Sequence, residues 1–174
     1  GSYVINDEMS TMNFKEKAVL EEAEYPTLIE KGFQKYIFED LLPKKYGFKT
    51  REEAFEKLRA DKKEFDDYYG FIYEISGIMN EEYGVPDLMP MWYYAPFEFF
   101  PWALRGLRGT SIDMRRHPKE MAEALQAIDE FVSPSFFDFA KNCTDSPDHV
   151  FQHSMLIMAH SIVSPKQFGL YYWP

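Results

Sequence analysis

The chain has 174 residues and a formal net charge of −10 at neutral pH, and 18% of its residues are aromatic. This acidity disfavours nucleic-acid binding, because affinity for phosphates comes mainly from lysine and arginine. A single cysteine excludes an internal disulfide and predicts a cytoplasmic protein. No apolar run reaches the roughly 20 residues that a membrane span requires, so no membrane partner is expected.

The N-terminal part contains one clear helical pattern. Residues 13–20 fit either a short edge strand or a loop, and their periodicity does not decide between the two. From Pro26 onward, apolar residues recur three and four positions apart, which predicts an amphipathic helix that stops at Pro43.

The next segment has a capping pattern. Thr50 and Glu53 are spaced as in a capping box, in which each side chain satisfies a free backbone N–H at a helix start. The apolar positions that follow predict two helices or one broken helix, which ends near Gly84. Residues 88–94 are apolar and aromatic between prolines, which predicts a buried strand.

The C-terminal part predicts one long helix and a second strand. Prolines and glycines in 95–117 favour short helical turns and loops. Pro118 opens a long helix that we expect to be interrupted or kinked at Pro134, and 149–158 is a candidate strand. Ser164 is a candidate N-cap for a final helix. This order of strands and helices is typical of parallel βαβ units, so the expected fold class is α/β and helix-rich.

Two blocks of sequence carry a resemblance to a known superfamily. The first comprises Ala95-Pro96-Phe97-Glu98, Leu104-Arg105-Gly106, Arg108-Gly109, Asp113, Arg116 and Pro118. The second comprises Ser164-Pro165-Lys166-Gln167-Phe168 and Tyr172-Trp173-Pro174, and weaker similarity extends upstream through Glu24-Tyr25 and residues 37–43. Over residues 20–174 the chain resembles the uroporphyrinogen decarboxylase superfamily, which includes corrinoid-linked methyltransferases.

The resemblance implies an incomplete (β/α)8 TIM barrel. Such barrels need about 250 residues, and Gly1-Ser2 at the start is typical of a cleaved tag. We therefore expect one partial barrel domain over residues 3–174, taken from a longer protein. Because an incomplete barrel exposes sheet edges and apolar helix faces, a homo-oligomer or a complementing chain is the expected assembly.

The resemblance also predicts a site, because barrel enzymes bind substrate in the loops after their strands. The expected substrate-binding residues are Phe97, Trp102, Arg105, Arg108 and His153. Trp102 takes the place of the pocket tyrosine of the decarboxylase branch, and it can stack on a tetrapyrrole but offers no phenolic oxygen. The early arginine and aspartate motifs of that branch are not found before residue 90, so no catalytic residue is assigned.

No cofactor is expected on this chain, although a corrinoid-dependent parent would use zinc and a corrinoid such as cobalamin. The methyltransferase branch binds zinc through His-x-Cys and a distant cysteine, a pattern that the sequence lacks. His149 and His153 are four residues apart and would share one face of a helix or strand. With no third convergent ligand, ordinary hydrogen-bonded histidines are favoured over a metal site.

Other candidate residues also allow two interpretations. The local basic patch suits recognition of carboxylates or phosphates, but its arginines also suit structural pairing with Glu98 or Asp113. The patch consists of Arg105, Arg108, Arg115 and Arg116. The aromatic residues between Trp92 and Trp102 form either a stacking wall for a ligand or part of a core.

Three functions follow from these observations. The first is a fragment of an enzyme that moves a methyl group between a methylated substrate, a corrinoid protein and an acceptor thiol. The second is decarboxylation of a tetrapyrrole side chain. The third is a non-catalytic binding or assembly module, and in each case we expect the 174-residue chain alone to lack turnover.

Overall fold

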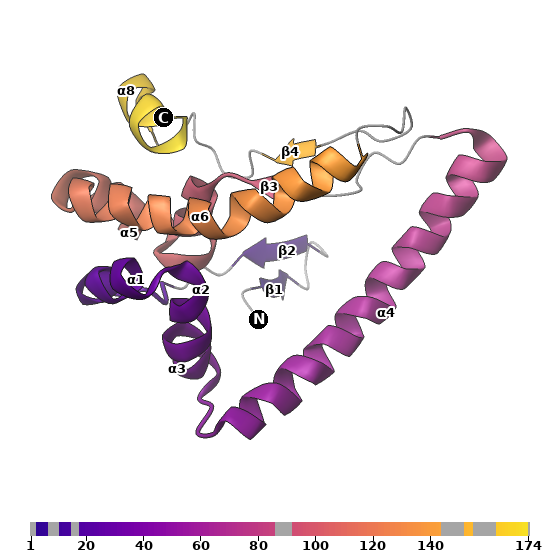
Figure 1. Cartoon of the computed structure of the whole chain (residues 1–174), viewed down its shortest axis with the longest axis horizontal. Coiled ribbons are helices and arrows are strands. Elements are labelled where there is room, and N and C mark those ends of the chain that lie inside the picture. Colours follow the sequence, from indigo (N-terminus) through magenta and orange to yellow (C-terminus); the bar gives the residue numbers. More distant parts are fainter. Residues whose placement is uncertain are drawn as a thin grey trace. The chain divides into compact units, whose positions relative to one another are not determined.

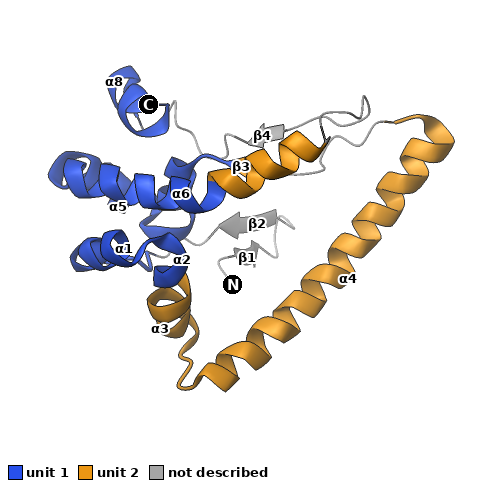
Figure 2. Ribbon diagram, in the orientation of Figure 1, with its two compact units in different colours: residues 1–36, 94–132, 154–174 blue, residues 37–93, 133–153 orange. Residues whose placement is uncertain are grey.

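The computed structural model describes residues 3–6, 11–14, 18–85, 92–143, 152–154 and 163–173. Figure 1 shows that most of these residues are helical, which confirms the helix-rich expectation. The chain divides into two compact units, coloured separately in Figure 2. Unit 1 comprises residues 1–36, 94–132 and 154–174, and unit 2 comprises 37–93 and 133–153.

The described strands are short and form two sheets of two strands each. In the first sheet β1 (Tyr3–Asn6) pairs antiparallel with β2 (Thr11–Phe14). In the second, β3 (Trp92–Tyr94) pairs with β4 (Gln152–Ser154), inside the segments where the two later strands were predicted. The rest of those two predicted strands, residues 88–91, 149–151 and 155–158, lies outside the described residues.

The helix predicted from Pro26 is divided, and Pro43 does not end it. Gly32 has a positive φ of 75°, a conformation that L side chains rarely adopt, and it separates the first two helices. Pro43 lies in the first turn of the last helix, where a backbone N–H has no helical partner to lose. The segments are the 3-10 turn Glu22–Glu24, α1 (Tyr25–Lys31), α2 (Phe33–Tyr36), the π-helical turn Ile37–Leu41 and α3 (Leu42–Tyr46).

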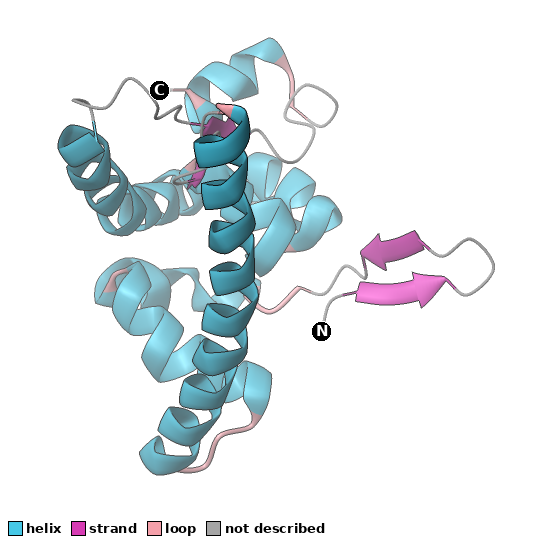
Figure 3. Ribbon diagram, turned by 90° about the vertical axis from the view of Figure 1, so that its right-hand side faces the viewer, coloured by secondary structure: helices cyan, strands magenta, loops and turns pink. Residues whose placement is uncertain are grey.

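The predicted break in the following helix is also wrong. Helix α4 (Arg51–Tyr83) runs unbroken for 33 residues, as Figure 3 shows, and ends at Gly84, which adopts the left-handed conformation. The charged residues Asp61-Lys62-Lys63 separate the apolar positions and suggested the interruption. Three lysine–aspartate ion pairs, each between residues one helical turn apart, stabilise the helix in this region. They are Lys57–Asp61, Lys62–Asp66 and Lys63–Asp67.

The start of α4 confirms the capping prediction with one difference. The Thr50 hydroxyl accepts a hydrogen bond from the Glu53 N–H at 3.2 Å. The Glu53 carboxylate accepts from the backbone N–H of Lys49 at 2.8 Å, one residue before the cap itself. Both side chains therefore satisfy backbone donors at the start of the helix, as a capping box does.

Residues 106–116 form one continuous helix, although short helical turns and loops were predicted there. Gly106 starts it with a φ of 70°, and the hydroxyl of Thr110 donates to the Gly106 carbonyl at 2.7 Å. Gly106 thus begins a helix and Gly109 lies inside it, and neither ends a helix. The segments in this region are the 3-10 turn Pro96–Glu98, the π-helical turn Phe100–Leu104 and α5 (Gly106–Arg116).

The long helix predicted from Pro118 is present as α6 (Pro118–Cys143), and it continues through Pro134 without interruption. Its residues up to Val132 belong to unit 1, and those from Ser133 belong to unit 2. The predicted N-cap is confirmed, because Ser164 and Gln167 form a capping box at the start of α8 (Pro165–Gln167). A π-helical turn, Phe168–Tyr172, follows.

The core of unit 1 lies between α1, α2, the turns after β3, and α6. Tyr25 stacks on Phe100 with 6.0 Å between ring centroids, and Phe33 meets Phe99 edge-on at 5.6 Å. Aromatic rings carry large apolar areas, so these pairs account for much of the unit's packing. The fully buried residues here include Leu20, Leu28, Tyr36, Phe97, Met121, Ala124 and Ile128.

Candidate functional site

The most highly organised polar cluster of unit 1 is centred on Asp113, a fully buried residue of α5. Arg105, just before this helix, donates from Nε to Asp113 Oδ2 at 2.6 Å and from Nη2 to Oδ1 at 3.1 Å. The Tyr25 hydroxyl donates to the same Oδ2 at 2.7 Å. The carboxylate is therefore held by a two-pronged guanidinium pair and a phenol, the strong type of charge-assisted hydrogen bonding.

Arg105 also fastens the segment before α1 to the segment before α5. Its Nη1 donates to the Leu20 carbonyl at 2.7 Å, and its Nη2 lies 3.4 Å from a carboxylate oxygen of Glu22. In return, the backbone N–H of Leu20 donates to the Leu104 carbonyl at 2.9 Å. A Cβ on Gly109 would lie 3.1 Å from that of Arg105, so a glycine here leaves room for the arginine.

The electrostatics of the cluster follow from this geometry. Burial and the hydrogen bond to Asp113 strongly raise the pKa of the Tyr25 hydroxyl. Burial opposes the charge on Arg105, but the hydrogen bond and the charge of Asp113 outweigh it and raise the arginine's pKa. The tyrosine thus stays neutral and the arginine charged, which suits a permanent ion pair better than a proton relay.

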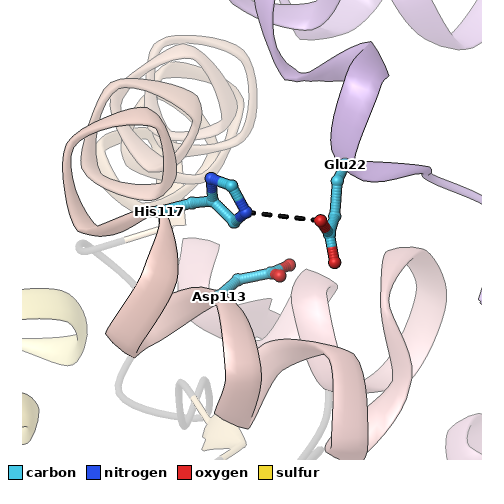
Figure 4. Close-up of side chains that lie close together, drawn as sticks. All are labelled: Glu22, Asp113 and His117. Atoms are coloured by element: carbon cyan, nitrogen blue, oxygen red, sulfur yellow. Dashed lines mark ion pairs between the residues drawn. The ribbon is translucent and has the colours of Figure 1, made fainter.

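Three side chains of this cluster also have a spacing compatible with a metal ion. Single donor atoms of Glu22, Asp113 and His117 lie within 4.8 Å of one another, and Figure 4 shows them converging. The His117 Nε2 is 3.4 Å from a Glu22 oxygen. The guanidinium of Arg105, however, already occupies both oxygens of Asp113, and a divalent cation would have to share that carboxylate with a fixed positive charge. The donor set therefore fits an ion-pair network and does not fit a metal centre.

The stability of the protein above pH 10 tests the raised pKa of the Tyr25 hydroxyl. The unfolded tyrosine ionises near pH 10, whereas Tyr25 in the folded chain keeps its proton. The unfolded state then binds fewer protons, so the free energy of unfolding falls as the pH rises, by about 1.4 kcal/mol per pH unit for one such group. Tyr25→Phe should reduce this slope by that amount in urea denaturation at increasing pH. Equal slopes for the variant and the parent chain would contradict the assignment.

The five predicted substrate-binding residues have different surroundings. Phe97 is fully buried and packs against Tyr172 at 5.8 Å, and Arg105 is committed to Asp113. Trp102 is 41% exposed and stacks on Tyr94 at 6.1 Å. Arg108 is exposed on α5, as are the other two arginines of the patch, Arg115 and Arg116. His153 lies in β4, and His149 lies outside the described residues.

A surface on α4 in unit 2 was not anticipated as a site. We define the α4 stripe as Phe65, Tyr68, Ile72, Ile75 and Met79, which are between 40% and 61% exposed. The helix contains no buried residue along its whole length. Phe65, Ile72 and Met79 follow one another at intervals of seven residues, and Tyr68 and Ile75 lie three residues after Phe65 and Ile72. This is the spacing of the apolar seam of a coiled coil.

Unit 2 also contains a cavity of about 660 Å³ at the start of α4. Its apolar walls include Phe38 and Leu42 on one side and Phe55 and Leu58 of α4 on the other. Lys49 and Arg51 are also among its lining residues, together with Glu39 and Thr50. The volume lies in the range of about 300–1,000 Å³ that is usual for small-molecule sites.

Comparisons with known proteins add no family to these observations. No protein-family model matches the chain, and no curated protein or solved structure matches it at a significant level. Among the helices of the described ranges, none is both long enough and apolar enough to cross a bilayer.

Proposed function

We propose that this chain is a non-catalytic assembly module that pairs with a second copy of itself through the α4 stripe. The observation that carries the proposal is a 33-residue helix with no buried residue and a repeating row of exposed apolar side chains. Monomeric proteins rarely expose a continuous apolar surface of this kind, and such surfaces usually mark interaction sites.

The apolar area of the stripe is of the size that association requires. A helix of this length is about 50 Å long, and a fully buried Leu, Ile, Phe or Met side chain is worth about 1.5–3 kcal/mol. Association costs about 4–15 kcal/mol in lost freedom of the two partners. The stripe residues are 40–61% exposed, so pairing covers about half of each side chain, and ten such side chains contribute about 7–15 kcal/mol. This gain is of the same size as the cost.

The sequence of the helix favours a second copy as the partner. A seven-residue apolar repeat packs best against a helix that has the same repeat. The other long described helix, α6, already buries its apolar face, including Met121, Leu125 and Ile128, in unit 1. A second α4 supplies both the matching repeat and an equally exposed stripe.

The charges of α4 favour an antiparallel pair. Every basic residue of the helix lies at or before Lys63, whereas the charged residues after Tyr68 are all acidic. An antiparallel arrangement places the half of one helix that contains all of its basic residues beside the half of the other whose charged residues are all acidic. A parallel pair would bring Glu82, which continues the seam seven residues after Ile75, next to its own copy, and like charges in register are destabilising.

Analytical ultracentrifugation of the purified chain over a wide range of concentrations tests the proposal. We expect a reversible change from the 20.6 kDa monomer to a species of twice that mass. Increasing salt should weaken the association only slightly, because its main contribution is apolar. A species that keeps the monomer mass at every concentration would overturn the assignment.

The enzymatic function implied by the sequence resemblance is a second proposal. It is supported by the pairing of β3 with β4 and by the exposed Trp102 that stacks on Tyr94 directly after β3, a position where a barrel enzyme would bind a flat ligand. In this proposal the chain is part of an incomplete TIM barrel, and its parent is a cytoplasmic corrinoid-dependent methyltransferase or, alternatively, a tetrapyrrole decarboxylase. Quenching of tryptophan fluorescence by cobalamin would favour the first reaction, and quenching by a porphyrin would favour the second.

A further inference from the structure

We infer that the cavity at the start of α4 binds a small amphipathic anion, with an apolar body and one carboxylate. This inference concerns unit 2 alone and does not rest on pairing through the α4 stripe. It follows from the cavity's volume, its apolar walls and the two cations among its lining residues.

The walls of the cavity come from two segments that are close in sequence. Phe38 and Leu42 come from the turn before α3 and from its first residue, and Ala54, Phe55 and Leu58 share one face of α4. The Phe38 and Phe55 side chains are each 54% exposed, so apolar carbon faces water when the cavity is empty of ligand. Covering these rings with an aliphatic or aromatic body releases that water, which favours binding.

The polar groups select the sign of the ligand's charge. Lys49 and Arg51 supply two positive charges among the lining residues, against one negative charge on Glu39. The guanidinium of Arg51 lies over the Phe55 ring, 5.3 Å from its centroid, so a cation sits directly on an apolar wall. Two cations beside an apolar cavity are complementary to a ligand with an apolar body and an anionic end, in a chain that is otherwise strongly acidic.

The start of the α4 helix is not itself the recognition element. Two backbone donors in this region are already served, since Thr50 accepts from the Glu53 N–H and Glu53 accepts from the Lys49 N–H. A ligand carboxylate would therefore be held by the two side-chain cations. The recognition can be removed by substitutions that leave the capping residues unchanged.

Isothermal titration of the full chain with decanoate, below the concentration at which it forms micelles, tests the inference. Decanol offers the same apolar body without the charge. We expect decanoate to bind at least about tenfold more tightly than decanol, as a charge-assisted contact implies. The double variant Lys49→Gln/Arg51→Gln should lose this tenfold preference and retain the helical circular dichroism of the parent chain.

Matched variants separate the cavity from other surfaces. Lys62→Gln/Lys63→Gln removes the same charge from α4 outside the cavity, so it should keep the preference for decanoate. Ala54→Trp fills the cavity and should abolish binding of both ligands, whereas Ile72→Asp alters the α4 stripe and should leave binding unchanged. Equal affinities for decanoate and decanol, or loss of binding with Ile72→Asp and not with Ala54→Trp, would overturn the inference. Neither result would bear on the mass of the assembly, which tests the proposed function separately.

Discussion

Asp113→Ala is expected to lower the free energy of unfolding by about 3–5 kcal/mol, the range found when one partner of a buried ion pair is removed. The substitution would leave the Arg105 guanidinium, whose side chain is only 10% exposed, without its counter-charge. It would also remove the acceptor of the Tyr25 hydroxyl inside the protein. Urea denaturation of the chain, followed by tryptophan fluorescence, measures the loss.

Two companion variants make this expectation specific. Glu22→Gln removes an acid of the same cluster that is 48% exposed, and it should cost less than about 1 kcal/mol because exposed ion pairs are weak. The double variant Arg105→Met/Asp113→Leu replaces the pair with apolar side chains, so it should recover the part of the loss that comes from the unpaired guanidinium. If Asp113→Ala is as mild as Glu22→Gln, the pair does not hold the segment around Leu20 in place.

Ile72→Asp is expected to raise the dissociation constant of the proposed dimer by at least about 100-fold, which corresponds to 2.7 kcal/mol. In a symmetric pair the substitution occurs twice, so it removes two apolar contacts and introduces two carboxylates into the contact. Sedimentation equilibrium gives the constant directly. Circular dichroism shows whether α4 itself stays helical.

Ala60→Asp is the matched control for this variant. It introduces the same charge on the same helix, at an exposed position that lies off the α4 stripe. We expect it to leave the dissociation constant within about threefold of the parent value, which corresponds to less than 1 kcal/mol. A similar loss for both variants would mean that charge on α4, and not the stripe, controls association.

Local signals predicted the ends of the helices well. The capping residues Thr50 and Ser164 begin α4 and α8, and Gly84 ends α4, as the sequence indicated. Each of these features depends on groups within a few residues of one another, so a single sequence contains the necessary information. Pro43 and Gly106 were misinterpreted, because a proline or glycine in a first helical turn looks the same in sequence as one that ends a helix.

The candidate site could be predicted only in part, because its partners are distant in sequence. The arginine patch suggested either ligand recognition or pairing, and the structure pairs Arg105 with Asp113 and with the carbonyl of Leu20, which is 85 residues away. The sequence around Tyr25 contains no pattern that predicts its hydrogen bond to Asp113, which lies 88 residues later. The α4 stripe, by contrast, could have been found from its seven-residue spacing, but Asp61 at a seam position favoured the prediction of a break.

Pro134 should make the two parts of helix α6 differ in their stability against local unfolding. A proline has no backbone N–H, so Pro134 cannot donate to the carbonyl of Glu130 four residues earlier. Helix α6 therefore lacks one backbone hydrogen bond close to the boundary between the units. The buried turns around Ile128 should therefore exchange their amide hydrogens with solvent slowly, whereas the turns after Pro134 can fray from the Cys143 end without disturbing them. We therefore expect the two parts of this continuous helix to unfold locally at different rates. Within α6, a protease should cleave first in the part after Pro134.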